Sequence, residues 1–155
     1  MAGIRHLTEG DLPRLRKFWL DYWGGDVMIV HGETIRYDQV EGLIHGAWTG
    51  ALTYIIRGDE CEIVSLNSVQ EGIGIGTALI GEVVKEAKAR RCRRIVLTTT
   101  NDNLHALGFY QRHGFALKAI RPGAINETRK IKPSIPLIGE NNIPLRDEIE
   151  LEMMI

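Results

Sequence analysis

The chain has 155 residues, of which 44% are hydrophobic and 25% charged, and its formal net charge is −1. That length predicts one domain with a substantial core. The balance of charge excludes a general basic field of the kind that binds nucleic acid or an anionic membrane surface, so we expect neither partner. No apolar run resembles a signal peptide or approaches a membrane span, and we expect a cytoplasmic protein.

The first strand and helix of the chain are predicted from residues 4–24. Residues 4–7 form a short strand, and Thr8 or Asp11 caps the helix that follows. Gly24-Gly25 ends that helix. One helical face carries the aliphatic and aromatic side chains Leu12, Leu15, Trp19 and Tyr22 or Trp23, which we expect to be buried.

A β meander is predicted next. Residues 26–41 show little periodicity, so we expect a loop over the sheet with a short helix near Tyr37. The meander itself is predicted as strands over residues 43–48, 52–57 and 61–66, with hairpin-like turns at Thr49-Gly50 and Gly58-Asp59. Cys61 and Cys92 lie in aliphatic, strand-like surroundings without framework-like spacing, and we expect reduced core residues rather than a disulfide.

Three glycines at alternate positions, Gly72, Gly74 and Gly76, lead from the meander into an amphipathic helix over residues 74–90. Such a loop exposes backbone N–H groups at a helix N-terminus, where the helix dipole also favours negative charge. The pattern predicts a cradle for a diphosphate group. A turn that only lets strand and helix pack closely is the alternative that the loop alone leaves open.

Two common diphosphate-binding motifs do not fit this loop. A dinucleotide fingerprint, G-x-G-x-x-G, requires a glycine where Thr77 or Leu79 stands, depending on whether Gly72 or Gly74 is counted first. A P-loop, G-x-x-x-x-G-K-[ST], requires a lysine that follows none of these glycines. Both spacings argue against a protein that uses this loop to bind ATP or NAD.

The rest of the chain predicts further strands and helices. These are a strand over residues 94–100, a helix over 103–113, a strand over 115–121 and a strand over 148–153. Glutamates alternate with apolar residues in the last strand, which we expect to be wet on one face. The connection 122–146 holds four prolines and is expected to contain a short helix around residues 124–130.

A second motif follows the strand at residues 94–100. It resembles N-x-x-A-x-x-[FL]-Y-x-x-x-G-F and is matched by Asn103, Ala106, Phe109, Tyr110, Gly114 and Phe115. The glycine loop, through Gly74 and Gly76, resembles [RQ]-x-x-G-x-[GA], although Glu71 stands where arginine or glutamine is usual. With the intervening elements in the same order, the chain resembles the GNAT superfamily of N-acetyltransferases, closely over its second half and in element order over its first half.

This resemblance implies an α/β (α+β) fold with a single domain over residues 1–155. The implied central sheet is mixed and mostly antiparallel, is splayed between its fourth and fifth strands, and has helices on both faces. The implied activity is transfer of an acetyl group from acetyl-CoA to a primary amine by direct attack in a ternary complex, without a metal. A catalytically inactive acyl-CoA-binding sensor or regulatory module is the alternative.

The resemblance also implies the residues that hold the cosubstrate. They come from the end of the strand at 61–66, the glycine loop and the second motif. The set is Leu66, Asn67, Ser68, Glu71, Gly72, Ile73, Gly74, Ile75, Gly76, Thr77, Asn103 and Tyr110. Asn103 has a second interpretation as a helix N-cap and could serve both roles. The arginines Arg90, Arg91, Arg93 and Arg94 could reach the 3′-phosphate of coenzyme A, but favourable charge at a helix C-terminus is the interpretation we prefer.

Two side chains are candidates for proton transfer. Tyr110 is implied as the acid that protonates the leaving thiolate, with a core tyrosine as the alternative. Glu62 falls where one branch of the superfamily carries a basic glutamate, with a water-exposed strand glutamate as the equal alternative. We expect a small-molecule or peptide amine as acceptor, we hypothesise that residues 122–146 cover its site, and a homodimer stays open.

Overall fold

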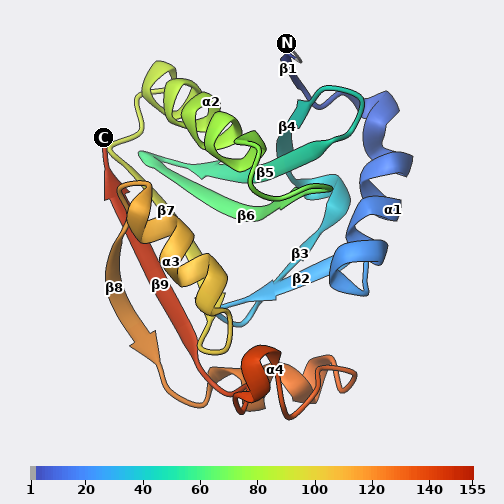
Figure 1. The fold of residues 1–155 in the computed structure, drawn as a ribbon, viewed down its shortest axis with the longest axis vertical. Coiled ribbons are helices and arrows are strands. Elements are labelled where there is room, and N and C mark those ends of the chain that lie inside the picture. Colours follow the sequence, from blue (N-terminus) through green and yellow to red (C-terminus); the bar gives the residue numbers. More distant parts are fainter. Residues whose placement is uncertain (1–2) are drawn as a thin grey trace. The chain divides into compact units, whose positions relative to one another are not determined.

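The computed structural model describes residues 3–155, which form two compact units (Figure 1). The first unit contains residues 3–28, 34–95 and 154–155, and the second contains residues 29–33 and 96–153. No helix in the described part of the chain is long and apolar enough to cross a membrane.

The first unit is built on antiparallel strands in the order β1-β4-β5-β6. Its elements are β1 (Ile4–His6), η1 (Glu9–Asp11), α1 (Leu12–Trp23), η2 (Tyr37–Gln39), β4 (Glu41–His45), β5 (Gly50–Arg57), β6 (Glu60–Ser68) and α2 (Ile75–Ala89). Strand β7 (Arg94–Thr100) begins in this unit and continues in the second. The predicted helices and strands of this region are confirmed, with boundaries that move by a few residues.

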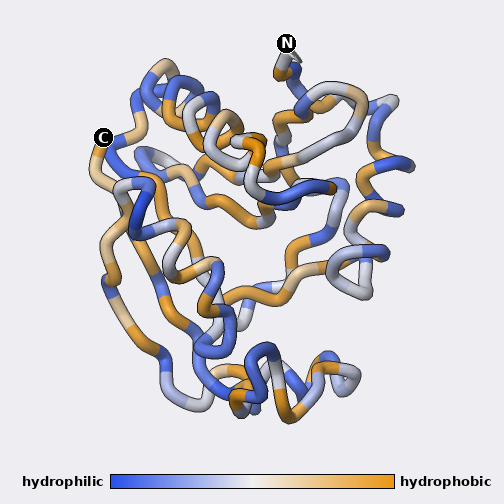
Figure 2. Tube along the Cα trace, viewed as in Figure 1, coloured by the Kyte–Doolittle hydropathy of each residue, from blue (hydrophilic) through white to orange (hydrophobic). Residues whose placement is uncertain are grey.

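Helix α2 covers one face of the strands β4, β5 and β6. Its buried side chains lie along one helical face and are Ile75, Leu79, Ile80, Val83 and Ala87, as expected for the predicted amphipathic helix. Figure 2 shows the matching pattern, with hydrophobic residues concentrated on the strands and alternating with hydrophilic ones along α1 and α2. Burial of this stripe, rather than helix propensity, accounts for most of the stability of such a helix.

Asp11 is the N-cap residue of helix α1 but its side chain makes no capping bond to that helix, and Gly24 ends the helix as predicted. The backbone N–H and hydroxyl of Thr8 both donate to the Asp11 carboxylate, at 2.8 and 2.9 Å, and Arg5 pairs with the same carboxylate. At the other end Gly24 adopts a left-handed conformation, φ 72°, and donates its N–H to Leu20 O. Leu15 and Trp19 are buried as expected, whereas Tyr22 and Trp23 are exposed.

Two expectations for the first half of the chain were wrong. Residues 26–41 contain a hairpin of β2 (Val27–Val30) and β3 (Glu33–Arg36) instead of a loop, although the short helix at Tyr37 is present as η2. The hairpin turn, His31-Gly32, has positive φ at both residues, the geometry of a type I′ turn that Asn-Gly usually signals. Trp48 lies in a turn with φ 61° rather than in a strand.

The second unit has the strand order β7-β9-β8, with β8 at the edge and antiparallel to β9. Its remaining elements are α3 (Leu104–Arg112), β8 (Ala116–Arg121), α4 (Ala124–Ile131), η3 (Glu140–Asn142) and β9 (Glu148–Met154, whose last residue belongs to the first unit). The short helix expected around residues 124–130 is therefore present.

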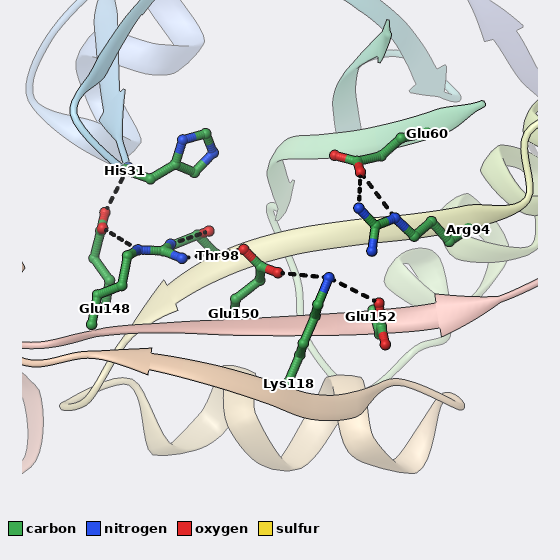
Figure 3. A network of polar contacts seen from close by, with 9 residues as sticks. His31, Glu60, Arg94, Thr98, Lys118, Glu148, Glu150 and Glu152 are labelled. Atoms are coloured by element: carbon green, nitrogen blue, oxygen red, sulfur yellow. Dashed lines mark hydrogen bonds and ion pairs between the residues drawn. The ribbon is translucent and has the colours of Figure 1, made fainter. Parts of the chain in front are cut away.

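The glutamates of β9 do not form the wet face that their alternation predicts. Arg121 donates to Glu148 and Glu150, both at 3.1 Å, and Lys118 lies 3.4 Å from Glu150 and 3.3 Å from Glu152 (Figure 3). Glu148 is only 3% exposed, and its second oxygen accepts the backbone N–H of His31 at 3.0 Å. The positive side chains of β8 thus allow the glutamates of β9 to be buried or half-buried instead of facing water.

Candidate functional site

Strand β6 carries a bulge just before the residues predicted to bind the cosubstrate. Thr53 of β5 is opposite Ser65, but the next residue, Tyr54, is opposite Ile63, so Val64 is the extra residue. The Thr53 and Ser65 hydroxyls are buried and lie 2.6 Å apart. A bulge changes the direction of the side chains around it and is often found near functional sites. Leu66, Asn67 and Ser68 follow this irregularity.

The register assigns the two faces of β6. Gly50 is opposite Ser68, and a side chain at Gly50 would meet Ile75 and Leu79 of α2, so Ser68 and Gly50 share the α2 face. Asn67 is opposite Ala51 and therefore points to the other face, where its amide oxygen accepts the Trp23 indole N–H at 2.8 Å. Helices α1 and α2 accordingly cover opposite faces of this sheet, as predicted.

The glycine loop is open and adopts left-handed backbone conformations. Gly72 has φ 81° and Gly74 has φ 85°, a region that other residues enter only with strain. Within residues 3–155, the amides of Gly72, Ile73, Gly74 and Gly76 donate no hydrogen bond. Gly74 is the N-cap of α2 and, having no side chain, offers no capping group. The loop therefore presents unpaired N–H groups at the positive end of a 15-residue helix.

The surroundings of the loop suit a ligand with both charged and apolar parts. Residues 69–74 are exposed, including the predicted contact Glu71. Two apolar side chains flank the glycines in solvent, Val69 at 56% and Ile73 at 58% exposure. Ile75, the first residue of α2, is in contrast buried against Gly50 and fixes where the helix begins. Thr77 is exposed in the first turn of α2.

Glu62 lies on the same face of β6 as Asn67, because it is opposite Ile55 while the neighbouring Cys61 and Ile63 point the other way. It is only 3% exposed, and the Arg57 guanidinium donates to its carboxylate at 2.8 Å. The alternative of a water-exposed strand glutamate is therefore wrong. A buried, ion-paired carboxylate is present where a base is predicted, and its role in proton transfer stays a prediction.

Tyr110 lies in α3 of the second unit and is 9% exposed. Its ring makes edge contacts with Phe109, at 5.3 Å between centroids, and with Phe115, at 5.5 Å. Burial raises the pKa of the Tyr110 phenol above its usual value. A phenol is protonated in the neutral range even at its usual pKa, and burial favours the same form, which is the form that can donate a proton.

Asn103 is the N-cap of α3, and its side-chain oxygen accepts the backbone N–H of Ala106 at 3.1 Å. The N-cap interpretation is confirmed, and contact with the cosubstrate stays a prediction. The two preceding residues, Asn101 and Asp102, were not predicted as functional. An Asn-Asp-Asn run immediately before a helix is the signal that could have drawn attention to them, since these side chains bond readily to nearby backbone.

Asn101 and Asp102 hold the long connection 122–146 against the start of α3. The Asn101 side chain accepts the N–H groups of Arg146 and Asp147, at 3.1 and 3.0 Å, and donates to Pro144 O at 2.8 Å. Asp102 is 5% exposed and accepts the N–H of Glu140 at 2.8 Å. The connection is therefore an ordered part of the second unit. Whether it covers the acceptor stays a prediction.

The arginine cluster after α2 is largely paired with carboxylates. Arg90 contacts Glu41 at 2.6 Å and Glu86 at 3.7 Å, Arg93 contacts Asp59 at 3.6 Å, and Arg94 contacts Glu60 at 2.5 Å. These pairs favour the structural interpretation over a site for the 3′-phosphate.

Cys61 and Cys92 are buried and free, as expected. No cluster of metal-ligating side chains occurs in the described residues 3–155.

The family of the chain is shown by sequence comparison. The model of the acetyltransferase (GNAT) family matches residues 12–115. Two proteins of Bacillus subtilis strain 168 are similar over most of their length: uncharacterized protein YdhI, 42% identical over 139 residues, and uncharacterized protein YxbD, 41% identical over 138 residues. The first match covers 87% of each chain, and the second covers 86% of this chain and 87% of its relative.

Solved structures agree on the fold. IAA acetyltransferase from Bacillus cereus superposes with a TM-score of 0.75 at 20% identity, and the superposition covers 100% of this chain and 100% of that one. A GNAT family acetyltransferase from Elizabethkingia anophelis with acetyl-CoA bound gives 0.73 at 23% identity, over 99% of this chain and 98% of that one. A Bacillus subtilis acetyltransferase in complex with CoA gives 0.71 at 20% identity, over 100% and 99%. The predicted α/β fold is confirmed, and the chain belongs to the GNAT family of acetyltransferases.

Proposed function

We propose that this protein transfers the acetyl group of acetyl-CoA to the nitrogen of a primary amine. One observation carries the proposal: in the part of the chain that the structure describes, the amides of Gly72, Ile73, Gly74 and Gly76 are unpaired at the start of α2. Such a row of N–H groups fits a diphosphate, which is the charged part of coenzyme A. Two of the similar structures hold CoA or acetyl-CoA, which supports the same cosubstrate here.

The loop binds far from the reacting carbon, and this has a consequence for catalysis. The exposed Val69 and Ile73 side chains offer apolar contact beside the diphosphate cradle. Binding energy from these remote contacts positions the thioester for attack without changing the chemistry itself. Acetyl-CoA supplies an activated acyl group, and the residues of the chain have to place it and manage two protons.

Acetyl transfer forms one bond and breaks another. The amine nitrogen forms a bond to the thioester carbon, the carbon–sulfur bond breaks, and the thiolate takes up a proton. Tyr110, whose phenol is protonated at neutral pH, is our proposed donor of that proton. The amine, which is mostly ammonium at neutral pH, loses one proton before attack to Glu62 or to water that Glu62 holds. The nitrogen loses a second proton as the amide forms, and that proton restores the Tyr110 phenol, so that one proton is released to solvent in each turnover.

Direct transfer is favoured over an acetyl-enzyme intermediate. The obvious nucleophile for such an intermediate is a thiolate. Both cysteines are buried. The pKa of Cys61 is raised to about 12, and the largest cause of this rise is desolvation of the thiol. A buried thiol of that kind is a poor nucleophile, which supports attack by the amine in a ternary complex.

The test is incubation of the protein with acetyl-CoA and a panel of amines and amino-acid amides, followed by free thiol and by the mass of the products. We expect thiol release that depends on the amine, together with an acetylated amine. Initial-rate plots at several amine concentrations should intersect. Acetyl-CoA binding without transfer to any acceptor would favour the inactive sensor instead, and parallel plots would contradict direct attack.

A further inference from the structure

Trp23 connects α1 to a residue predicted to lie at the cosubstrate site. It is the last residue of α1, and 39% of its surface is exposed. Its indole nitrogen lies 2.8 Å from the side-chain oxygen of Asn67, near the end of β6. Neither the two family motifs nor the predicted set of site residues includes Trp23.

The Trp23 contact decides which way the Asn67 amide points. The oxygen and nitrogen of an asparagine amide have to be assigned from their hydrogen bonds. An indole N–H can donate but cannot accept, so the group that faces Trp23 has to be the oxygen. The Asn67 NH₂ group is therefore the end that points away, and within residues 3–155 it has no hydrogen-bond partner. Asn67 thus offers oriented donors.

These donors lie on the face of β6 that α2 does not cover. The glycine loop leads into α2 on the face shared by Gly50 and Ser68, whereas Asn67 and the candidate base Glu62 share the α1 face. A base has to reach the amine and not the diphosphate. The Asn67 side chain is therefore on the side from which the amine would approach.

We propose that Asn67 and Trp23 form a subsite for the acceptor. The Asn67 NH₂ group donates to a carbonyl or carboxylate oxygen of the acceptor, and the Trp23 ring packs against its apolar side chain. The inference rests on the proposed function and specifies its substrate class. The acceptor is an α-amino compound, such as an amino-acid amide or a peptide N-terminus, in which an oxygen lies close to the amine. Polyamines and alkylamines lack this oxygen.

The test compares two ligands that differ in that group. Leucinamide and 3-methylbutylamine share an apolar side chain and an amine, but only leucinamide has the carbonyl. Binding of each is measured by titration calorimetry to the CoA-loaded protein and to the free protein, for wild type, Trp23→Phe and Asn67→Ala. Tyr22→Phe is the matched control, because Tyr22 is an equally exposed aromatic residue of α1.

We expect wild type to prefer leucinamide and both variants to weaken its binding about tenfold, the loss typical of one hydrogen bond. Binding of 3-methylbutylamine should change less than about twofold in both variants, CoA binding should change less than about twofold in Trp23→Phe, and Tyr22→Phe should behave as wild type. Equal losses for both amines, or no preference in wild type, would overturn the subsite. Weaker CoA binding in Asn67→Ala would assign the side chain to the cosubstrate instead.

These readouts separate the two proposals. A wild-type protein that binds leucinamide selectively but never acetylates it would contradict the proposed function and support the subsite. A protein that acetylates alkylamines as readily as leucinamide, with the same rates in Trp23→Phe, would support the function and overturn the subsite. The comparison of each ligand across variants also cancels the difference in amine pKa between the two ligands.

Discussion

The loops that precede α2 and α3 occupy similar places in the fold but differ in how their polar groups are hydrogen-bonded. Each follows a β-strand and opens a helix, and each carries one of the two family motifs. Among the described residues, the amides of Gly72, Gly74 and Gly76 have no acceptor, whereas Asn101, Asp102 and Asn103 use their side chains to bond backbone groups of the second unit. Unpaired polar groups suit a ligand, and satisfied ones suit a scaffold. We therefore propose that the first loop is a binding element and that the second is a positioning element for α3.

The largest effect is expected for the residue that the second loop positions. Tyr110→Phe should lower kcat about 100-fold, because a general acid contributes at least that factor, and should leave the Kd of acetyl-CoA within about twofold. Steady-state kinetics and calorimetry measure the two quantities. Unchanged kcat would remove the acid role, and a large rise in Kd would make Tyr110 part of the binding element.

The second loop should be sensitive to added volume. A Cβ at Gly139 would lie 2.1 Å from the Asp102 carboxylate and 2.7 Å from its carbon. Gly139→Ala should therefore destabilise the protein by about 2 kcal/mol, as overpacking of a filled site does. Chemical denaturation measures the loss. In the Asp102→Ala background the same substitution should cost much less, and additive effects would show that the two residues do not meet.

The glycine loop should respond in the opposite way, with loss of binding rather than stability. Gly74→Ala has open space for its Cβ but a φ of 85°, so the loop has to change its conformation. We expect the Kd of acetyl-CoA to rise about tenfold, equivalent to about 1.4 kcal/mol.

Gly81→Ala is the matched control for that prediction. Gly81 lies in the interior of α2 with open space and no positive φ, so alanine should stabilise the helix by up to about 1 kcal/mol and leave the Kd unchanged. Equal affinity of Gly74→Ala and Gly81→Ala for acetyl-CoA would mean that the loop conformation is not used for binding.

The smallest effect concerns the carboxylates of the second unit. Burial alone would raise the pKa of Glu150, but hydrogen bonds from Arg121 and Lys118 outweigh it and lower the pKa below the usual value. The contacts of Glu150 with Arg121 and Lys118 therefore stabilise the folded state at pH values above the unfolded pKa of about 4.3. This contribution is lost as the pH falls toward the pKa of Glu150 in the folded state.

The matching variant is Glu150→Gln, which should cost less than about 1 kcal/mol at pH 7, since the carboxylate is partly exposed. Urea titrations at pH 7 and pH 3 should show the difference between wild type and variant shrinking at the lower pH. A difference in stability between wild type and Glu150→Gln that grows at pH 3 would contradict a lowered pKa for Glu150.

The sequence was sufficient for the features that depend on local pattern. The glycine loop, the α3 motif and the helix ended by Gly24 each follow from residues close together in the chain, and α2 begins within one residue of its predicted start. The β2–β3 hairpin was missed because four-residue strands carry too little periodicity, and because His31-Gly32 is a rare pair for its turn.

The remaining misses depend on partners far away in sequence. The pairing of Glu148 with Arg121 joins residues 27 positions apart, and the bond from Asp102 to Glu140 joins residues 38 apart. The Trp23–Asn67 bond spans 44 positions. No local pattern indicates which acidic or amide side chain will find such a partner, so these contacts needed the fold.

The central claim, that the glycine loop binds the diphosphate of coenzyme A, is tested most directly by amide NMR during a titration. Coenzyme A should shift the amide signals of Gly72, Gly74 and Gly76 strongly and those of Asn101 and Asn103 weakly, because the N–H groups of Asn101 and Asn103 already donate to Asp147 O and Thr100 O. Pantetheine, which lacks the diphosphate, should leave the glycine signals in place. Saturable binding of coenzyme A with unmoved glycine signals, or equal shifts with pantetheine, would contradict the account.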